Sequence, residues 1–156
     1  RGVQHKKVVC ILDEAHLLEK ETLEEFRFLL NYKFDSVSPM AVVLVGQTEL
    51  WENKLKLQRY AAIRQRIDMY CTLPHLDRSE TEQYIGSHMA YSGCSQEVFT
   101  EKAVDEIHKA SAGIPRMINR ICEKALMYAF QQQRRLVDDY MIKFVVEHEM
   151  LTVTTK

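Results

Sequence analysis

Two adjacent carboxylates close an apolar run near the start of the sequence. The run Val8-Val9-Cys10-Ile11-Leu12 is typical of a strand covered on both faces, and Asp13 and Glu14 follow it directly. A buried strand end gains nothing from paired negative charges unless a cation or a proton lies nearby. In nucleotide hydrolases the first such acid holds Mg²⁺, usually through water, and the second orients the attacking water. The alternative is that both acids begin the next helix, where they suit the positive end of its dipole.

A polar side chain also follows the second apolar run, residues 41–46. Because the carboxyl ends of parallel strands meet at one edge of a sheet, Gln47 is expected in the same crevice as the acids. There its amide could hold the attacking water or touch a γ-phosphate, although an ordinary turn residue would also fit. His16 is interpreted as a polar residue behind the reacting groups or on the surface. A metal-binding role is not expected for it, because no ligand set of the usual spacing accompanies it.

Three arginines are the remaining candidates. Arg64 and Arg66 precede a third apolar run, and an arginine at such a helix-to-strand junction would be held stiffly enough to project toward a neighbouring subunit. Arg66 is the first choice and Arg64 the second. Arg116 lies in the first turn of a strongly apolar helix, where the helix dipole disfavours a cation. An anionic partner would explain this placement, and the alternative is a surface arginine that reaches back to Glu101 or Glu106.

The elements that position these residues change character at Pro74. Before it, strand-like runs at 8–12, 41–46 and 67–73 alternate with helical patterns at 20–32 and 49–66, and Ser38-Pro39 ends the first helix. This alternation predicts a parallel sheet with helical crossovers.

After Pro74 only helical periodicity is found, and four helices are predicted. Three of them follow a capping residue: Asp77 or Ser79, Thr100 and Asp138. The third helix instead begins at Pro115, because proline favours the first helical position. Gly113 occupies a position where a left-handed helix end is expected. The third helix has the most regular apolar stripe: Ile118, Ile121, Cys122, Ala125, Leu126 and Ala129.

The composition is that of an ordinary globular chain. It has 156 residues, 46% of them apolar, which fits one domain, or one small domain with part of another. A formal net charge of −1 gives no bulk electrostatic argument for binding nucleic acid or an anionic membrane. The chain lacks a C-x-x-C pair and any apolar run of about 18 residues. Reduced thiols in a soluble, cytoplasmic protein without membrane contact are therefore expected at Cys10, Cys71, Cys94 and Cys122.

Together these features resemble the AAA+ ATPases, and within them the ExeA/GspA-like group of general secretion and its relatives that serve transposons. Five segments carry the resemblance: the Walker B strand at 8–16, sensor 1 at 43–50, the arginine-finger segment at 65–67, the hinge at 73–77 and sensor 2 at 110–119. The implied fold is α/β, with the C-terminal part of a parallel-sheet P-loop nucleotide-binding domain over residues 1–74. A small all-α four-helix lid would cover residues 75–150, with a tail at 151–156.

The resemblance also implies roles for the candidate residues. Asp13 would bind Mg²⁺, Glu14 would activate water, and Gln47 would sense the γ-phosphate of ATP. Arg66, or less readily Arg64, would stabilise transition-state charge in the adjacent protomer's site, which requires a head-to-tail ring or an open helical assembly.

Arg116 would contact the nucleotide from the lid. The implied function is Mg-ATP hydrolysis coupled to conformational work on a protein or DNA assembly that the sequence does not identify. A secretion ATPase is preferred; a transposition-accessory ATP-binding protein or a degenerate, non-catalytic binding module is the alternative.

One departure from the family is large. No G-x-x-x-x-G-K-[S/T] motif occurs, and none of the five glycines belongs to a phosphate-cradling cluster. The chain is therefore expected to be a fragment of the ATPase that is inactive alone, because the β- and γ-phosphates lack their lysine and backbone N–H donors.

Overall fold

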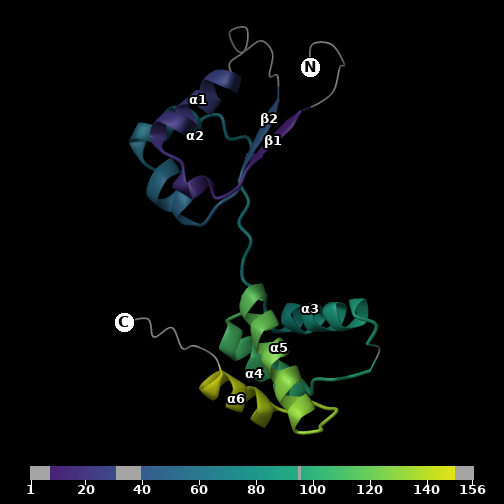
Figure 1. Ribbon diagram of the computed structural model, residues 1–156. Coiled ribbons are helices and arrows are strands. Elements are labelled where there is room, and N and C mark those ends of the chain that lie inside the picture. The colour runs from purple at the N-terminus through teal and green to yellow at the C-terminus, as the bar shows by residue number, and fades with distance from the viewer. Residues whose placement is uncertain (1–7, 31–39, 95, 150–156) are drawn as a thin grey trace. The chain divides into compact units, whose positions relative to one another are not determined.

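The computed structural model describes residues 8–30, 40–94 and 96–149, and the chain divides into two units, residues 1–71 and 72–156 (Figure 1). Each unit has its own hydrophobic core. The predicted helix end at Tyr32, its Ser38-Pro39 break and the tail at 151–156 lie outside the described residues.

Unit 1 is built on two parallel strands, β1 (Val9–Leu12) and β2 (Ala41–Leu44), with Val9 opposite Ala41 and Leu12 opposite Leu44. The predicted parallel arrangement is thereby confirmed. Hydrogen bonds continue past the strand ends, from the Val45 N–H to the Leu12 carbonyl (2.9 Å) and from the Ala15 N–H to the Val45 carbonyl (2.8 Å). The turn after β1 is therefore tied to the turn after β2.

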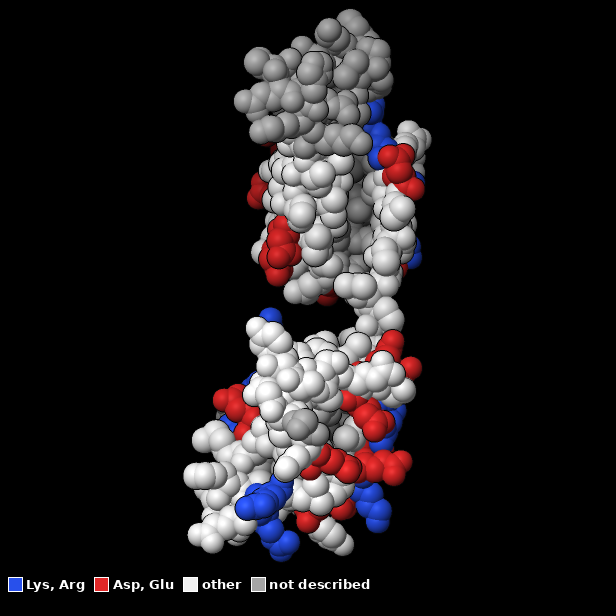
Figure 2. Space-filling view, turned by 90° about the vertical axis from the view of Figure 1, so that its right-hand side faces the viewer, with Lys and Arg blue, Asp and Glu red and all other residues white. Residues whose placement is uncertain are grey.

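The prediction that the first strand is covered on both faces is wrong for the described residues. Val9 is 58% and Ile11 66% exposed, whereas Cys10 and Leu12 between them are half-buried. The core that the strands contact lies on one side and is built from Ala15, Leu23, Leu50, Leu55, Tyr60 and Ile63. The side of this unit turned to the viewer in Figure 2 is largely uncharged, with Lys, Arg, Asp and Glu at its margins.

Two further predictions for unit 1 are wrong. The sheet of the described residues has two strands, and residues 67–73 do not form a third. Ile67 instead packs on the core, and Tyr70 stacks on Trp51 with ring centroids 4.4 Å apart. A strand needs a neighbour that completes its hydrogen bonds, and an apolar run does not encode that neighbour.

The helix predicted over 49–66 is broken. After α1 (Lys20–Leu30) and β2, the chain forms a π-helical segment (Leu50–Leu55), a 3₁₀ turn (Gln58–Tyr60) and the short α2 (Ala61–Arg64). Leu57 causes one interruption, because its backbone is extended, with φ −69° and ψ 146°.

Unit 2 contains the four predicted helices: α3 (Arg78–Tyr91), α4 (Glu101–Ser111), α5 (Pro115–Gln131) and α6 (Asp139–His148). Asp77, rather than Ser79, caps α3, and it forms a reciprocal capping box with Glu80. Thr100 caps α4 and Asp138 caps α6. The predicted stripe of α5 packs into the core, where Ile118, Ile121 and Ala125 are fully buried.

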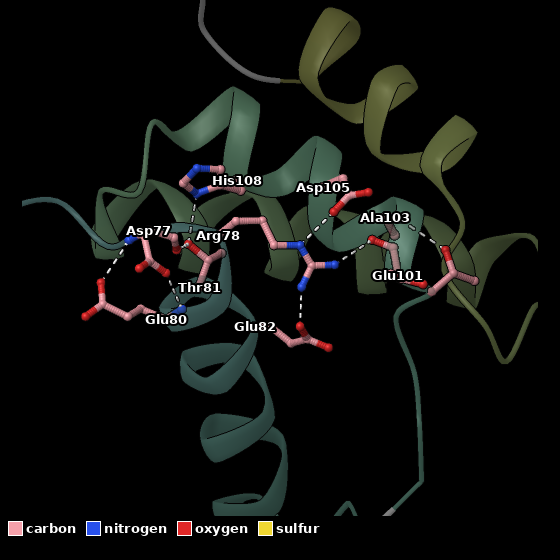
Figure 3. Close-up of polar contacts among 10 residues, drawn as sticks. Asp77, Arg78, Glu80, Thr81, Glu82, Glu101, Ala103, Asp105 and His108 are labelled. Atoms are coloured by element: carbon pink, nitrogen blue, oxygen red, sulfur yellow. Dashed lines mark hydrogen bonds and ion pairs between the residues drawn. The ribbon is translucent and has the colours of Figure 1, made fainter.

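Arg78 joins the first turn of α3 to α4 (Figure 3). Its Nε donates to Asp105 Oδ1 at 2.7 Å, Nη1 donates to Glu82, and Nη2 donates to the Glu101 carbonyl at 3.4 Å. The hydrogen bond to Asp105, together with the interaction with Glu82, raises the pKa of the Arg78 guanidinium. The contacts of Arg78 are exposed to solvent and join α3 to α4. The inner faces of these two helices contribute to the core of unit 2.

The cysteines of the described residues are all thiols. Cys10, Cys94 and Cys122 are half-buried, and Cys71 is exposed. Burial raises the pKa of Cys122 to about 12, so this group stays protonated at neutral pH. Within the described residues, no helix combines the length and the apolar character needed to cross a bilayer.

The turn between α4 and α5 requires glycine at position 113. Ala112 and Gly113 are both left-handed, with φ of 50° and 71°. The Gly113 carbonyl accepts a hydrogen bond from the Leu76 N–H at 2.9 Å, and a Cβ on Gly113 would lie 2.0 Å from the Leu76 carbonyl oxygen. The backbone that precedes α3 therefore packs directly on this turn.

We predict that Gly113→Ala lowers the free energy of unfolding of unit 2 by about 2 kcal/mol or more, because it adds left-handed strain and a backbone clash. Gly86→Ala is the matched control: Gly86 lies within α3, and a Cβ there meets nothing within 4 Å. It should raise stability by about 0.5–1 kcal/mol. Urea denaturation followed by circular dichroism at 222 nm measures both, because most of the described α-helix lies in unit 2. Equal midpoints for Gly113→Ala and the wild type would contradict the prediction.

Candidate functional site

The two acids lie in the turn after β1. Asp13 and Glu14 are exposed, and the Glu14 N–H donates to Asp13 Oδ1 at 2.8 Å. Glu14 has a left-handed backbone, with φ 51° and ψ 32°, and precedes a 3₁₀ turn over Ala15–Leu17. Because α1 begins only at Lys20, the acids do not start that helix. A non-glycine residue in this conformation carries strain of a kind that is concentrated at functional sites.

His16 contacts both turns at the carboxyl end of the sheet. Its Nε2 lies 3.5 Å from Glu14 Oε2, and its Nδ1 accepts a hydrogen bond from the Gln47 N–H at 3.4 Å. The His16 side chain is 12% exposed. The sequence indicated that His16 is a supporting polar residue, but it did not predict the contact with Gln47. The one signal was the small Gly46, which precedes Gln47.

The predicted neighbourhood of the acids and Gln47 is present in the structure. Gln47 is exposed just beyond β2, which directly adjoins β1. The hydrogen bond from the Ala15 N–H to the Val45 carbonyl and the contact between His16 and Gln47 join the two turns. Asp13, Glu14, His16 and Gln47 thus share one end of the sheet.

Arg64 and Arg66 differ in their surroundings. Arg64 is half-buried, and its Nη1 donates to the carbonyls of Leu55 and Lys56, both at 2.8 Å. These bonds hold the end of the π-helical segment against α2. Arg66 is exposed in the turn after α2, which leads into residues 67–73 rather than into a strand. The helix-to-strand junction predicted for these arginines is therefore absent.

Arg116 belongs to unit 2 and is exposed in the first turn of α5. Within the described part of the chain it forms no hydrogen bond or ion pair, so the alternative, in which it reaches back to Glu101 or Glu106, is not observed. Glu106 lies instead 3.8 Å from Lys143.

The donor set of the site suits Mg²⁺ held together with a phosphate ligand. Among the described residues, no group of three or more His, Cys, Asp or Glu side chains could enclose a metal ion. Mg²⁺ does not need such a cage, because it commonly binds one or two carboxylates, several waters and the phosphates of a substrate. Asp13 offers an exposed carboxylate that uses only Oδ1 in contacts with the described residues.

Known proteins resemble this chain in sequence and in fold. A family model described as an AAA domain matches residues 1–53. General secretion pathway protein A of Aeromonas hydrophila is 38% identical over 125 residues, which cover 80% of this chain and 23% of that protein. The Holliday junction branch migration motor RuvB of Thermotoga maritima has a similar fold, with a TM-score of 0.66 and 18% identity over 89% of this chain and 43% of that chain. A RuvB variant from the same organism gives a TM-score of 0.69 at 16% identity, with coverages of 89% and 43%.

These findings confirm that the chain resembles the AAA+ ATPases. Within that family it is similar to General secretion pathway protein A, and it spans about a quarter of the length of that relative. The α/β fold class expected from the sequence is confirmed, and the structural likeness to RuvB supports the fold alone.

We predict that Arg64→Ala lowers the free energy of unfolding of unit 1 by about 1–3 kcal/mol, because it leaves the Leu55 and Lys56 carbonyls without their charged donor. Gln65→Ala, at an exposed neighbouring position, is the control and should change stability by less than about 0.5 kcal/mol. Trp51 is the single tryptophan and belongs to unit 1, so its fluorescence during urea denaturation reports this unit. Identical midpoints for the two variants would show that the bonds of Arg64 do not stabilise unit 1.

Proposed function

We propose that the complete protein couples the binding and hydrolysis of Mg-ATP to conformational work on a protein or DNA assembly. The observation that carries this proposal is the placement of Asp13, Glu14 and Gln47 at the same end of two adjoining parallel strands. In open parallel sheets this end is where ligands bind.

The residues of unit 1 divide the work as follows. Bound Mg²⁺ would neutralise charge on the phosphates. Asp13 would hold this ion, and the hydrogen bond from the Glu14 N–H fixes the direction of the Asp13 carboxylate. Glu14 orients the attacking water and accepts its proton. Gln47 contacts the γ-phosphate through its amide.

Two arginines complete the proposal. Arg66 stabilises the transition-state charge in the site of an adjacent protomer, and its exposed position makes it the first choice over the half-buried Arg64. A head-to-tail assembly follows from an arginine that acts in trans. Arg116 contacts the nucleotide from the helical unit, and its exposure without an anionic partner among the described residues supports this role.

The biological role proposed first is that of a cytoplasmic secretion ATPase, because the curated relative is a general secretion pathway protein. A transposition-accessory protein, or a binding module that has lost its chemistry, is the second candidate. The reading frame upstream of Arg1 distinguishes the two classes: an in-frame P-loop supports the ATPase, and a start codon close to Arg1 supports the degenerate module.

We predict that Glu14→Gln in the protein encoded by the full reading frame lowers kcat for ATP hydrolysis by about 10²- to 10⁴-fold, the range expected on loss of a general base. Binding of Mg-ATP should be retained, because the phosphate and metal contacts remain. Glu21→Gln, at an exposed position in the first turn of α1, is the charge-matched control and should hydrolyse at the wild-type rate. A coupled phosphate-release assay measures kcat, and a Glu14→Gln variant as fast as the wild type would refute the role of Glu14.

For the 156-residue chain alone we predict no measurable binding or turnover of Mg-ATP, because it lacks the P-loop lysine and N–H donors. Isothermal titration calorimetry tests binding, with the full-length protein as the positive control. A dissociation constant in the micromolar range for the chain alone would overturn this prediction.

A further inference from the structure

The His16 imidazole meets the two turns of the site through its two nitrogens. The Gln47 backbone N–H can only donate, so His16 Nδ1 must accept at their 3.4 Å contact. In a neutral ring the proton then lies on Nε2, and Nε2 is the atom that faces Glu14 Oε2 at 3.5 Å. A single tautomer therefore suits both contacts.

The His16 ring is largely buried, whereas the Glu14 side chain that it faces is largely exposed. The His16 side chain is 12% exposed, and the Glu14 side chain is 63% exposed. A Cβ on Gly46 would lie 3.1 Å from His16 N and 3.3 Å from His16 Nδ1, so the glycine permits the ring to approach the second turn closely. Among the described residues, His16 makes the only polar side-chain contact of the Glu14 carboxylate. Without it, an exposed glutamate would sample several rotamers.

We propose that His16 is a positioning residue, which holds the Glu14 carboxylate in the place needed to orient the attacking water and fixes that place relative to Gln47. This inference rests on the proposed ATPase function. Glu14 remains the group that meets the water, and His16 acts only through it. In this arrangement a movement of the Gln47 backbone is transmitted to Glu14 through one ring.

Three substitutions of His16 separate this role from simple space filling. His16→Gln keeps an amide N–H near the position of Nε2 and so preserves the contact with Glu14. His16→Asn keeps an oxygen near the position of Nδ1 and preserves only the contact with Gln47. His16→Phe fills the space and preserves neither contact.

The experiment measures kcat and KM for ATP in the full-length protein. The stability of each variant is measured by Trp51 fluorescence in the 156-residue chain, where Trp51 is the single tryptophan. We expect His16→Gln to stay within about 3-fold of the wild-type kcat. His16→Asn and His16→Phe should lose about 10- to 100-fold, the loss typical when the partner that orients a functional ligand is removed. KM should change little. In a Glu14→Gln background, His16→Asn should cause no further loss, because the two residues act as one unit.

The outcomes distinguish this inference from the proposed function. A wild-type protein without turnover, or a fully active Glu14→Gln variant, overturns the ATPase function and the inference with it. An active wild type with an inactive Glu14→Gln variant, but with His16→Asn at the wild-type kcat, overturns the inference alone. The inference is also overturned if the loss of kcat in each variant follows its loss of stability, irrespective of which nitrogen position the new side chain keeps.

Discussion

The parallel pairing of β1 with β2 is the interaction on which the candidate site depends. The ladder continues past both strands, from the Val45 N–H to the Leu12 carbonyl and from the Ala15 N–H to the Val45 carbonyl. Because of these bonds, the turn that holds the two acids and the turn that holds Gln47 cannot separate without breaking the sheet. Polar residues that are far apart in the sequence are thereby held at one edge, where a phosphate ligand could meet them.

Much of the fold could be predicted because it is determined by local chemistry. The starts of α3, α4 and α6 depend on side chains that bond to N–H groups three residues further on, at Asp77, Thr100 and Asp138. The left-handed conformation of Gly113 likewise follows from its position after a helix. The run at 67–73 could not be interpreted in this way, because its conformation depends on which surface is available to Ile67 and Tyr70.

The candidate site could be predicted in part for the same reason. Asp13, Glu14 and Gln47 follow recognisable strands, and a parallel topology brings such strand ends together. The contacts of His16 depend instead on the left-handed backbone of Glu14 and on an approach to a residue 31 positions away. The different surroundings of Arg64 and Arg66 could not be predicted either. They depend on where the π-helical segment places the Leu55 and Lys56 carbonyls, which accept hydrogen bonds from Arg64.

The central claim is that this end of the sheet meets the terminal phosphate of a nucleotide. A crystal structure of the full-length protein with Mg²⁺ and a non-hydrolysable ATP analogue tests it most directly. We predict the metal within one water of the Asp13 carboxylate and the terminal phosphate within hydrogen-bonding distance of the Gln47 amide. An analogue bound away from the turns after β1 and β2, with Asp13 and Gln47 facing only solvent, would contradict the claim.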